Sequence, residues 1–82
     1  MIIKYFAWLK NITNIEEEII NDASITDVDS LKEYLRKKYP KMNKHFNEDN
    51  LIRVAINLSY TLNNKKINSN DEIALFPPVS GG

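Results

Sequence analysis

The residues with the clearest chemical potential stand at the end of the chain, where residues 74–82 read Ala-Leu-Phe-Pro-Pro-Val-Ser-Gly-Gly. Gly81 and Gly82 are the only two glycines of the sequence, so we expect the C-terminal carboxylate of Gly82 to be the reactive group. A carboxylate is inert until it is activated, for example as an acyl-adenylate, after which a nucleophile can displace the nucleotide. Glycine suits both steps because it has no Cβ to crowd them. If the nucleophile delivers sulfur, the product is a thiocarboxylate.

The segment before the two glycines is stiff. Pro77 and Pro78 cannot donate ladder hydrogen bonds and keep the backbone extended. Residues 77–82 reach about 20 Å when fully extended, which suits insertion of a thin tip into a narrow tunnel on another protein. The alternative is a frayed terminus, because small domains often lose order at their ends. We predict a folded domain over residues 1–76 and an extended tail over residues 77–82.

Other familiar reactive groups are missing from the sequence. There is no cysteine, which excludes a disulfide, a thiolate metal site and a cysteine nucleophile. His45 is the single histidine and lies beside lysines, which favours surface packing over a role as metal ligand or general base. Asp71 and Glu72 are paired acids, but they fall in an expected exposed turn. We expect no metal site and no permanently bound cofactor.

Composition limits the class of protein. The 82 residues predict one domain, and the 11 basic and 11 acidic residues cancel, which argues against a general nucleic-acid binder. Residues 16–33 hold seven acids and one base, whereas residues 36–44 hold five bases and no acid. This segregation indicates a solvated helix face, or a surface that orients a docking partner. No apolar run is long enough to span a bilayer, and we expect no signal peptide, no membrane contact and a cytoplasmic location.

Residues 2–8 predict a first strand, because they are rich in β-branched and aromatic side chains. Its outer face is a candidate contact surface, and a strand covered on both sides is the alternative. Alternation divides the strand into an inward set, Ile3, Tyr5 and Ala7, and an outward set that includes Phe6 and Trp8.

A short turn or helical bend over residues 9–14 leads to a second strand within residues 14–22. The three consecutive glutamates at positions 16–18 discourage pairing with another sheet and place this strand at an edge. The short spacing from the first strand favours a hairpin.

The main helix is the clearest element. Thr26 or Asp27 supplies an oxygen that caps its first turn, and Pro40 ends it because the residue before a proline is pushed out of helical geometry. Its apolar positions recur at spacings of three and four and predict one face packed on a sheet: Val28, Leu31, Leu35 and Tyr39.

The second half of the chain predicts a strong strand over residues 51–58. In it, one set of alternating positions is apolar and the other is mixed: Ile52, Val54, Ile56 and Leu58 alternate with Arg53, Ala55 and Asn57. Asparagine can supply a positive φ in a turn over residues 63–65, where glycine would usually stand. The other elements expected here are a short helix with Met42 and Phe46 that ends near Asn50, a stretch over residues 59–62 that continues or pairs back, a turn over residues 68–71 and a final strand over residues 72–76.

This order of elements predicts an α+β fold of the ubiquitin-like β-grasp type. A hairpin is followed by a helix that crosses a mixed sheet of four or five strands, and the right-handed crossover rule fixes the hand. In that topology the last strand runs parallel beside the first in the centre of the sheet. The tail then leaves from a rigid base.

At its end the sequence resembles a known family. Residues 76–82, Phe-Pro-Pro-Val-Ser-Gly-Gly, with Asp-Glu-Ile-Ala at residues 71–74, are similar to the C-terminal signature of the MoaD family, the small, sulfur-carrying subunits of molybdopterin synthase. Tyr-Phe-Ala at residues 5–7 and Val-Ala-Ile-Asn at residues 54–57 also fit the first and third strands of that family. The resemblance spans the chain and is specific mainly over the last dozen residues.

The resemblance implies a cycle of sulfur transfer. An ATP-dependent activating enzyme adenylates Gly82, and a persulfide-bearing sulfurtransferase converts it to the thiocarboxylate. The tail then enters the large subunit, which holds the active site, in a two-plus-two heterotetramer. Sulfur passes there to a cyclic pterin monophosphate, and two transfers build the dithiolene that binds molybdenum or tungsten. The residues implied in partner binding are Phe6, Phe76, Pro77, Pro78, Val79, Ser80 and Gly81, with Gly81 required for steric reasons in the tunnel.

Three other functions compete with this one. A ubiquitin-like modifier would join Gly82 to a target lysine through an isopeptide bond. A thiamine-pathway sulfur carrier shares the fold and the Gly-Gly end but is usually shorter and lacks the Phe-Pro-Pro run. A plain interaction module would use the surface of Phe6 and Trp8 and would not need Gly82.

Overall fold

A computed structural model of the chain describes residues 1–47 and 52–78. The predicted helix end near Asn50, the strand start at residue 51 and the tail residues Val79, Ser80, Gly81 and Gly82 lie outside the described residues. The described elements are β1 (Ile2–Tyr5), α1 (Leu9–Thr13), β2 (Glu17–Ile19), α2 (Val28–Lys38), α3 (Met42–Asn47), β3 (Arg53–Ile56), β4 (Ser59–Thr61) and β5 (Glu72–Phe76).

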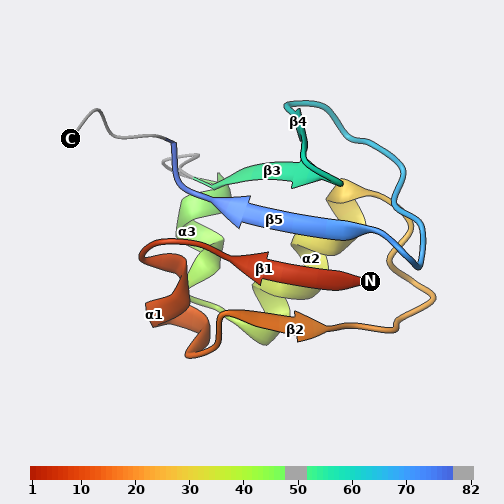
Figure 1. Cartoon of the computed structure of the whole chain (residues 1–82). Coiled ribbons are helices and arrows are strands. Elements are labelled where there is room, and N and C mark those ends of the chain that lie inside the picture. The colour runs from red at the N-terminus through yellow and green to blue at the C-terminus, as the bar shows by residue number, and fades with distance from the viewer. Residues whose placement is uncertain (48–51, 79–82) are drawn as a thin grey trace.

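The strands form one mixed sheet in the order β2-β1-β5-β3-β4. β5 lies in its centre, parallel to β1 and antiparallel to β3, and the β1–β2 and β3–β4 pairs are antiparallel hairpins (Figure 1). The predicted β-grasp arrangement is confirmed, including the central position and parallel direction of the last strand.

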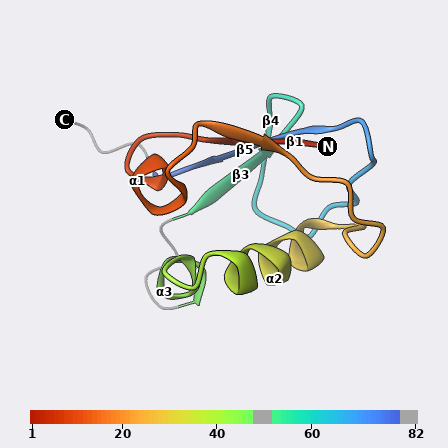
Figure 2. The same ribbon diagram turned by 90° about the horizontal axis from the view of Figure 1, so that it is seen from below.

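One face of the sheet carries the core. α2 and α3 lie on this face (Figure 2), and the opposite face, which we call the open face, has no helix in residues 1–47 and 52–78. Burial of each large apolar side chain is worth about 1.5–3 kcal/mol. The core residues of the central strands and the main helix include Ile3, Tyr5, Ile73, Leu75, Val28, Leu31 and Leu35.

The main helix begins and ends as its sequence predicts. Asp27 is the N-cap, its carboxylate accepts a hydrogen bond from the Ser30 amide at 2.8 Å, and the Ser30 hydroxyl accepts one from the Asp27 amide. This reciprocal pair satisfies amide groups that the first helical turn leaves unpaired. The helix ends at Lys38, two residues before Pro40.

The first strand is shorter than predicted. It ends at Tyr5, and Ala7, predicted inward, is exposed with a φ of 55°. This left-handed residue turns the chain into α1, so the alternation of strand side chains stops before Ala7. Trp8, predicted outward, is instead half-buried and packs against the core and the ring of His45.

The third strand is also shorter than predicted. It ends at Ile56, and Asn57 and Leu58, predicted as strand residues, form a two-residue turn between β3 and β4. Ile56 pairs with Ser59 across this turn, and the φ angles are 49° for Asn57 and 70° for Leu58. A leucine in the left-handed region costs about 1–2 kcal/mol. Within the described residues, the asparagines at positive φ are Asn14 and Asn57, not those of the predicted turn at residues 63–65.

Glu18 anchors the edge strand β2 to the end of α2. It pairs with Ile3 and accepts hydrogen bonds from the Tyr5 hydroxyl at 2.6 Å, the Tyr39 hydroxyl and the Lys38 ammonium. Burial opposes ionisation of Glu18, but these three donors outweigh it and hold the pKa of the carboxyl below its ordinary value. Glu18 was predicted only to discourage pairing at the sheet edge. In the structure it also stabilises the fold, because its hydrogen bonds join β2 to the end of α2.

Replacing Glu18 with glutamine should lower the free energy of unfolding by about 1–2 kcal/mol at pH 7, because charge-assisted hydrogen bonds are lost in a partly buried site. The folded-state pKa is lowered, so the stabilisation is present above the ordinary glutamate pKa of about 4.3 and is lost as pH falls further. Urea unfolding at several pH values should show the gap between wild type and Glu18→Gln shrinking below about pH 4.

The matched control is Glu17→Gln, since Glu17 is an exposed neighbour on the same strand. It should stay within about 0.5 kcal/mol of wild type at every pH. A gap for Glu18→Gln that widens toward acid pH would contradict the assignment.

Candidate functional site

The base of the tail is held on both sides by the sheet. β5 ends at Phe76, which pairs with Arg53 of β3, while the Phe6 amide donates to the carbonyl of Leu75 at 3.0 Å. Pro77 and Pro78, the last described residues, are half-buried and lie beyond the strand. The chain therefore leaves the centre of the sheet from a fixed point, at the end opposite to the N-terminus (Figure 1).

Three aromatic side chains on the open face surround this exit, and we call them the aromatic surface: Phe6, Tyr60 and Phe76. Phe6 is 48% exposed and Tyr60 is 53% exposed. The rings of Tyr60 and Phe76 lie 6.0 Å apart between centroids. An exposed group of this kind, beside the exit of a tail, is a surface that another protein can cover.

Four of the residues predicted to bind a partner come together at this exit: Phe6, Phe76, Pro77 and Pro78. Trp8, predicted as part of the same surface, is turned toward the core. Tyr60 was missed, and its place follows from the tight turn before it, because that turn sets Tyr60 opposite Ala55 in the sheet register. Predicted Val79, Ser80, Gly81 and Gly82 lie outside the described residues.

The middle of the open face is flatter and mixed in charge. Ala55 of β3 pairs with Ala74 of β5, and Ala74 pairs with Lys4 of β1. The Lys4 ammonium lies 3.1 Å from the carboxylate of Glu72, and both side chains are solvated. Such an exposed pair adds little stability. The middle of the open face thus has only small alanine side chains and an ion pair. The prominent apolar feature beside the tail is therefore the aromatic surface.

Asp71 and His45, two other candidates for chemistry, make contacts that stabilise the fold. Asp71 accepts hydrogen bonds from the Asn68 amide at 2.8 Å and from the side-chain amide of Asn57 at 2.9 Å. These two bonds, the one from Asn68 more than the one from Asn57, keep the pKa of the Asp71 carboxyl below its usual range. The ring of His45 packs on Trp8, with centroids 4.6 Å apart.

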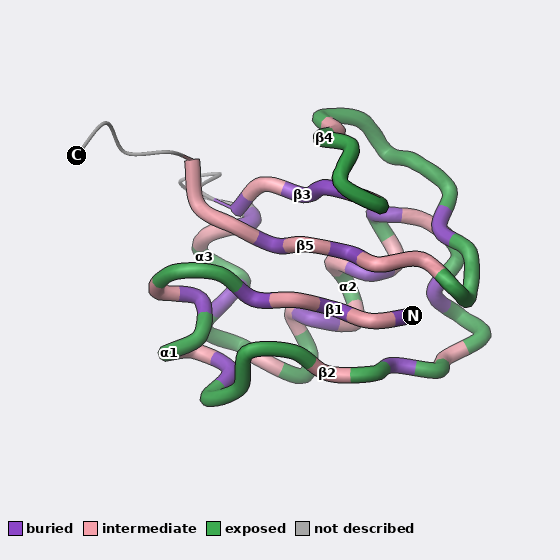
Figure 3. The backbone as a smooth tube through the Cα atoms, in the orientation of Figure 1, coloured by how far each residue is buried: buried purple, intermediate pink, exposed green. Residues whose placement is uncertain are grey.

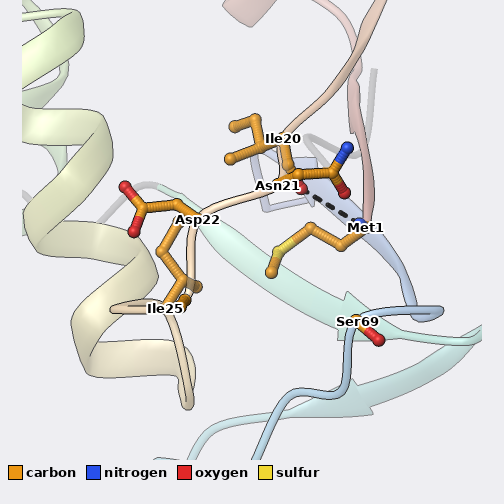
Figure 4. A pocket seen from close by; sticks show the side chains of 7 residues that line it. Met1, Ile20, Asn21, Asp22, Ile25 and Ser69 are labelled. Atoms are coloured by element: carbon orange, nitrogen blue, oxygen red, sulfur yellow. Dashed lines mark hydrogen bonds between the residues drawn. The ribbon is translucent and has the colours of Figure 1, made fainter.

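A pocket of about 410 Å³ lies at the other end of the molecule, beside the N-terminal end of β1 (Figure 4). The Met1 amine donates to the carbonyl of Ile20 at 3.0 Å there, and Asp22 accepts from the amide and hydroxyl of Ser24. The Met1 amine and the Asp22 carboxylate are thus already hydrogen-bonded within the chain. Within the described ranges we find no cluster of metal-binding side chains, and none of their helices is long and apolar enough to cross a membrane.

Comparison with known families decides the class of the chain. The model of the ThiS family matches residues 3–82, almost the whole sequence. The chain belongs to the ThiS family. It therefore has the ubiquitin-like fold of the ThiS and MoaD sulfur carriers, as the arrangement of its sheet indicates.

Two kinds of named protein are among the similar solved structures. The first includes a putative molybdopterin converting factor, subunit 1, from Pyrococcus furiosus, with 26% identity, a TM-score of 0.79 and 95% of each chain covered. The second includes SAMP1, the small archaeal modifier protein 1, from Haloferax volcanii, with 27% identity and a TM-score of 0.78 over 99% of this chain and 97% of that one.

A third structure shows the fold in a complex. It is subunit 1 of the molybdopterin-converting factor from Helicobacter pylori, solved with subunit 2 of that factor. The TM-score is 0.65 at 24% identity, with 99% of this chain and 96% of that chain covered. At this identity the likeness concerns the fold alone.

Replacing Phe6 with serine should lower the free energy of unfolding by about 1 kcal/mol, because about half of this side chain is already in water. Leu75 accepts the hydrogen bond from the Phe6 amide, but its side chain is fully buried, so Leu75→Ala should cost about 2–5 kcal/mol. Urea unfolding of both variants distinguishes an open face from a strand covered on both sides. A large loss for Phe6→Ser would show that Phe6 belongs to the core.

Proposed function

We propose that this ThiS-family chain is a sulfur carrier for molybdenum cofactor biosynthesis, acting as the small subunit of molybdopterin synthase. The observation that supports it best is the path of the chain end. The central strand β5 leads without a turn into Pro77 and Pro78 and then into a tail that ends in two glycines. The likeness to a molybdopterin converting factor subunit at 26% identity adds to it.

The proposed chemistry takes place at the carbonyl carbon of Gly82. Its carboxylate attacks the α-phosphate of ATP on the activating enzyme, and pyrophosphate leaves. The terminal sulfur of a persulfide on a sulfurtransferase then attacks the carbonyl carbon, and AMP leaves. A thiol reduces the resulting acyl disulfide and releases the thiocarboxylate. No side chain of the carrier acts as acid or base, so catalysis rests with the partners.

Delivery depends on the base of the tail. The proposed acceptor is the large synthase subunit, whose active site receives the tail and uses the sulfur to build the dithiolene on the pterin precursor. Full burial of a phenylalanine is worth about 1.5–3 kcal/mol, so covering the exposed part of Phe6 or Phe76 supplies roughly half of that or less. The opposing cost of ordering is about 1–2 kcal/mol for each tail residue. Pro77 and Pro78 lower that cost because they restrict the free chain. A two-plus-two assembly in the cytoplasm completes the proposal.

A second function is favoured by the likeness to SAMP1 at 27% identity over nearly the whole chain. In this alternative the amine of a target lysine attacks the activated carbonyl of Gly82, AMP leaves, and an isopeptide bond forms. The activation step is the same. Only the nucleophile differs, so the two functions are separated by their products.

Deleting Gly82, or adding one residue after it, should abolish thiocarboxylate formation, because activation takes place at this carboxylate. The measurement is intact-mass spectrometry after incubation with the activating enzyme, ATP and a sulfurtransferase. Wild type should gain the mass difference between sulfur and oxygen at its C-terminus. Both variants should unfold at the same temperature as wild type, since Gly82 follows the last strand. A sulfur gain in either variant would sink the mechanism.

Cells producing tagged protein should distinguish the two functions on a denaturing gel. A carrier that serves only the cofactor gives a single band, and cells without the chain lose molybdopterin. A modifier gives a ladder of heavier conjugates that disappears when Gly82 is deleted. A ladder together with normal molybdopterin in cells lacking the chain would replace the first proposal with the second.

A further inference from the structure

Leu58, in the turn between β3 and β4, combines an unfavourable backbone conformation with an exposed apolar side chain. Leu58 has a φ of 70°, in the region where glycine or asparagine is favoured at this position of a two-residue hairpin turn. Its side chain is also 89% exposed, so almost none of the apolar surface is recovered in the core. Strained residues without a folding benefit are found most often at functional contacts.

The turn holds Leu58 in a fixed place. The side-chain amide of Asn57 donates to Asp71 at 2.9 Å, and its carbonyl accepts from the Glu72 amide at 2.9 Å. These bonds fasten the tip of the hairpin to the start of β5. Leu58 is therefore presented on a rigid support, which reduces the ordering cost of any contact that it makes.

The exposed apolar character continues along the same hairpin toward the tail. Tyr60 belongs to the aromatic surface, and Leu62 is 77% exposed (Figure 3). Because the ring of Tyr60 packs on Phe76, a protein that covers the base of the tail also meets β4. The hairpin and the tail base are thus parts of one continuous face.

Two cations lie beside this apolar strip. A hollow of about 220 Å³ under β4 is lined by Tyr60, Thr61, Lys65 and Lys66 among others. Neither lysine forms an ion pair within residues 1–47 and 52–78. A partner surface complementary to this region is therefore apolar, with carboxylates placed to meet the two lysines.

The opposite edge of the sheet differs. β2 also exposes an apolar side chain, Ile19, at 71%, but it stands beside the exposed acids Glu16 and Glu17. Charged residues at an edge strand discourage association. β4, with Ser59, Tyr60 and Thr61, has no charge.

We propose that the β3–β4 hairpin, with Leu58 at its tip, is a second docking site for the protein that accepts the tail. The partner presents an apolar surface to Leu58 and Tyr60, and carboxylates to Lys65 and Lys66. This inference rests on the proposed function, because it assumes a partner that receives the tail.

The test uses Leu58→Gly in the full chain, because the two roles predict opposite signs. Glycine relieves the positive φ, so the thermal midpoint should rise by a few degrees. Affinity for the purified large synthase subunit, measured by calorimetry, should fall about tenfold or more. A purely structural role for Leu58 gives no loss of affinity. The matched control is Ile19→Thr, which removes another exposed apolar side chain, from the other edge, and should leave affinity unchanged.

Three outcomes overturn the proposal. They are an unchanged affinity for Leu58→Gly, an equal loss for Ile19→Thr, and wild-type self-association in sedimentation that Leu58→Gly abolishes, which would make a second copy the occupant. If wild type does not bind the large subunit, the proposed function fails. In that case the docking site is tested by comparing the KM of the activating enzyme for wild type and for Leu58→Gly. An unchanged KM overturns the docking site as well.

A charge test checks the partner chemistry. Lys65→Glu combined with Lys66→Glu should weaken binding and reduce its salt dependence, because attraction to partner carboxylates becomes repulsion. Lys37→Glu combined with Lys41→Glu is the control with the same change of charge. Both lysines are exposed on the helix side of the sheet, and this variant should bind as wild type. Tighter binding by the double variant would show a basic partner and contradict the proposal.

Discussion

The pairing of β1 with β5 is the constraint on which the rest of the structure depends. A strand from each end of the chain lies in the middle of the sheet, and Ile3, Ile73 and Leu75 below them are fully buried. A central strand with partners on both sides opens only when the domain unfolds. The tail that follows β5 is thereby attached to the most stable part of the molecule. The start of the tail at Pro77 is therefore fixed in place by the domain.

The same sheet gives its two faces different tasks. The inner face takes α2 and α3 and contains the apolar core, with Glu18 closing its edge through Tyr5, Tyr39 and Lys38. The open face supplies the aromatic surface, which we propose that another molecule covers. Alternation along β1 and β5 makes this division unavoidable, because each residue of these strands that anchors the core is followed by one that faces outward. Support and contact are therefore adjacent in sequence.

The main helix and the last strand could be predicted because their signals are local. Asp27, the spacing of Val28, Leu31 and Leu35, and Pro40 all agree, and β5 follows residue for residue. The errors fall where turns are made without glycine. Ala7 and Leu58 take positive φ, a choice that neither residue type favours and that tertiary contacts impose. Tyr60 could not be assigned to the site before the register of that turn was known.

The chemistry of the tail was accessible to sequence for a different reason. A carboxylate on glycine needs no surrounding side chains to be a substrate for activation, so residue type and position carry the argument without coordinates. For the same reason the domain alone does not choose between the two proposed products. In both proposals the nucleophile, sulfur or a lysine amine, attacks the same carbonyl carbon. Both also need a folded domain that fixes the start of the tail. Under either proposal, selection between the products lies in which partner docks on the open face, and in whether that partner brings a persulfide or an amine to the activated end.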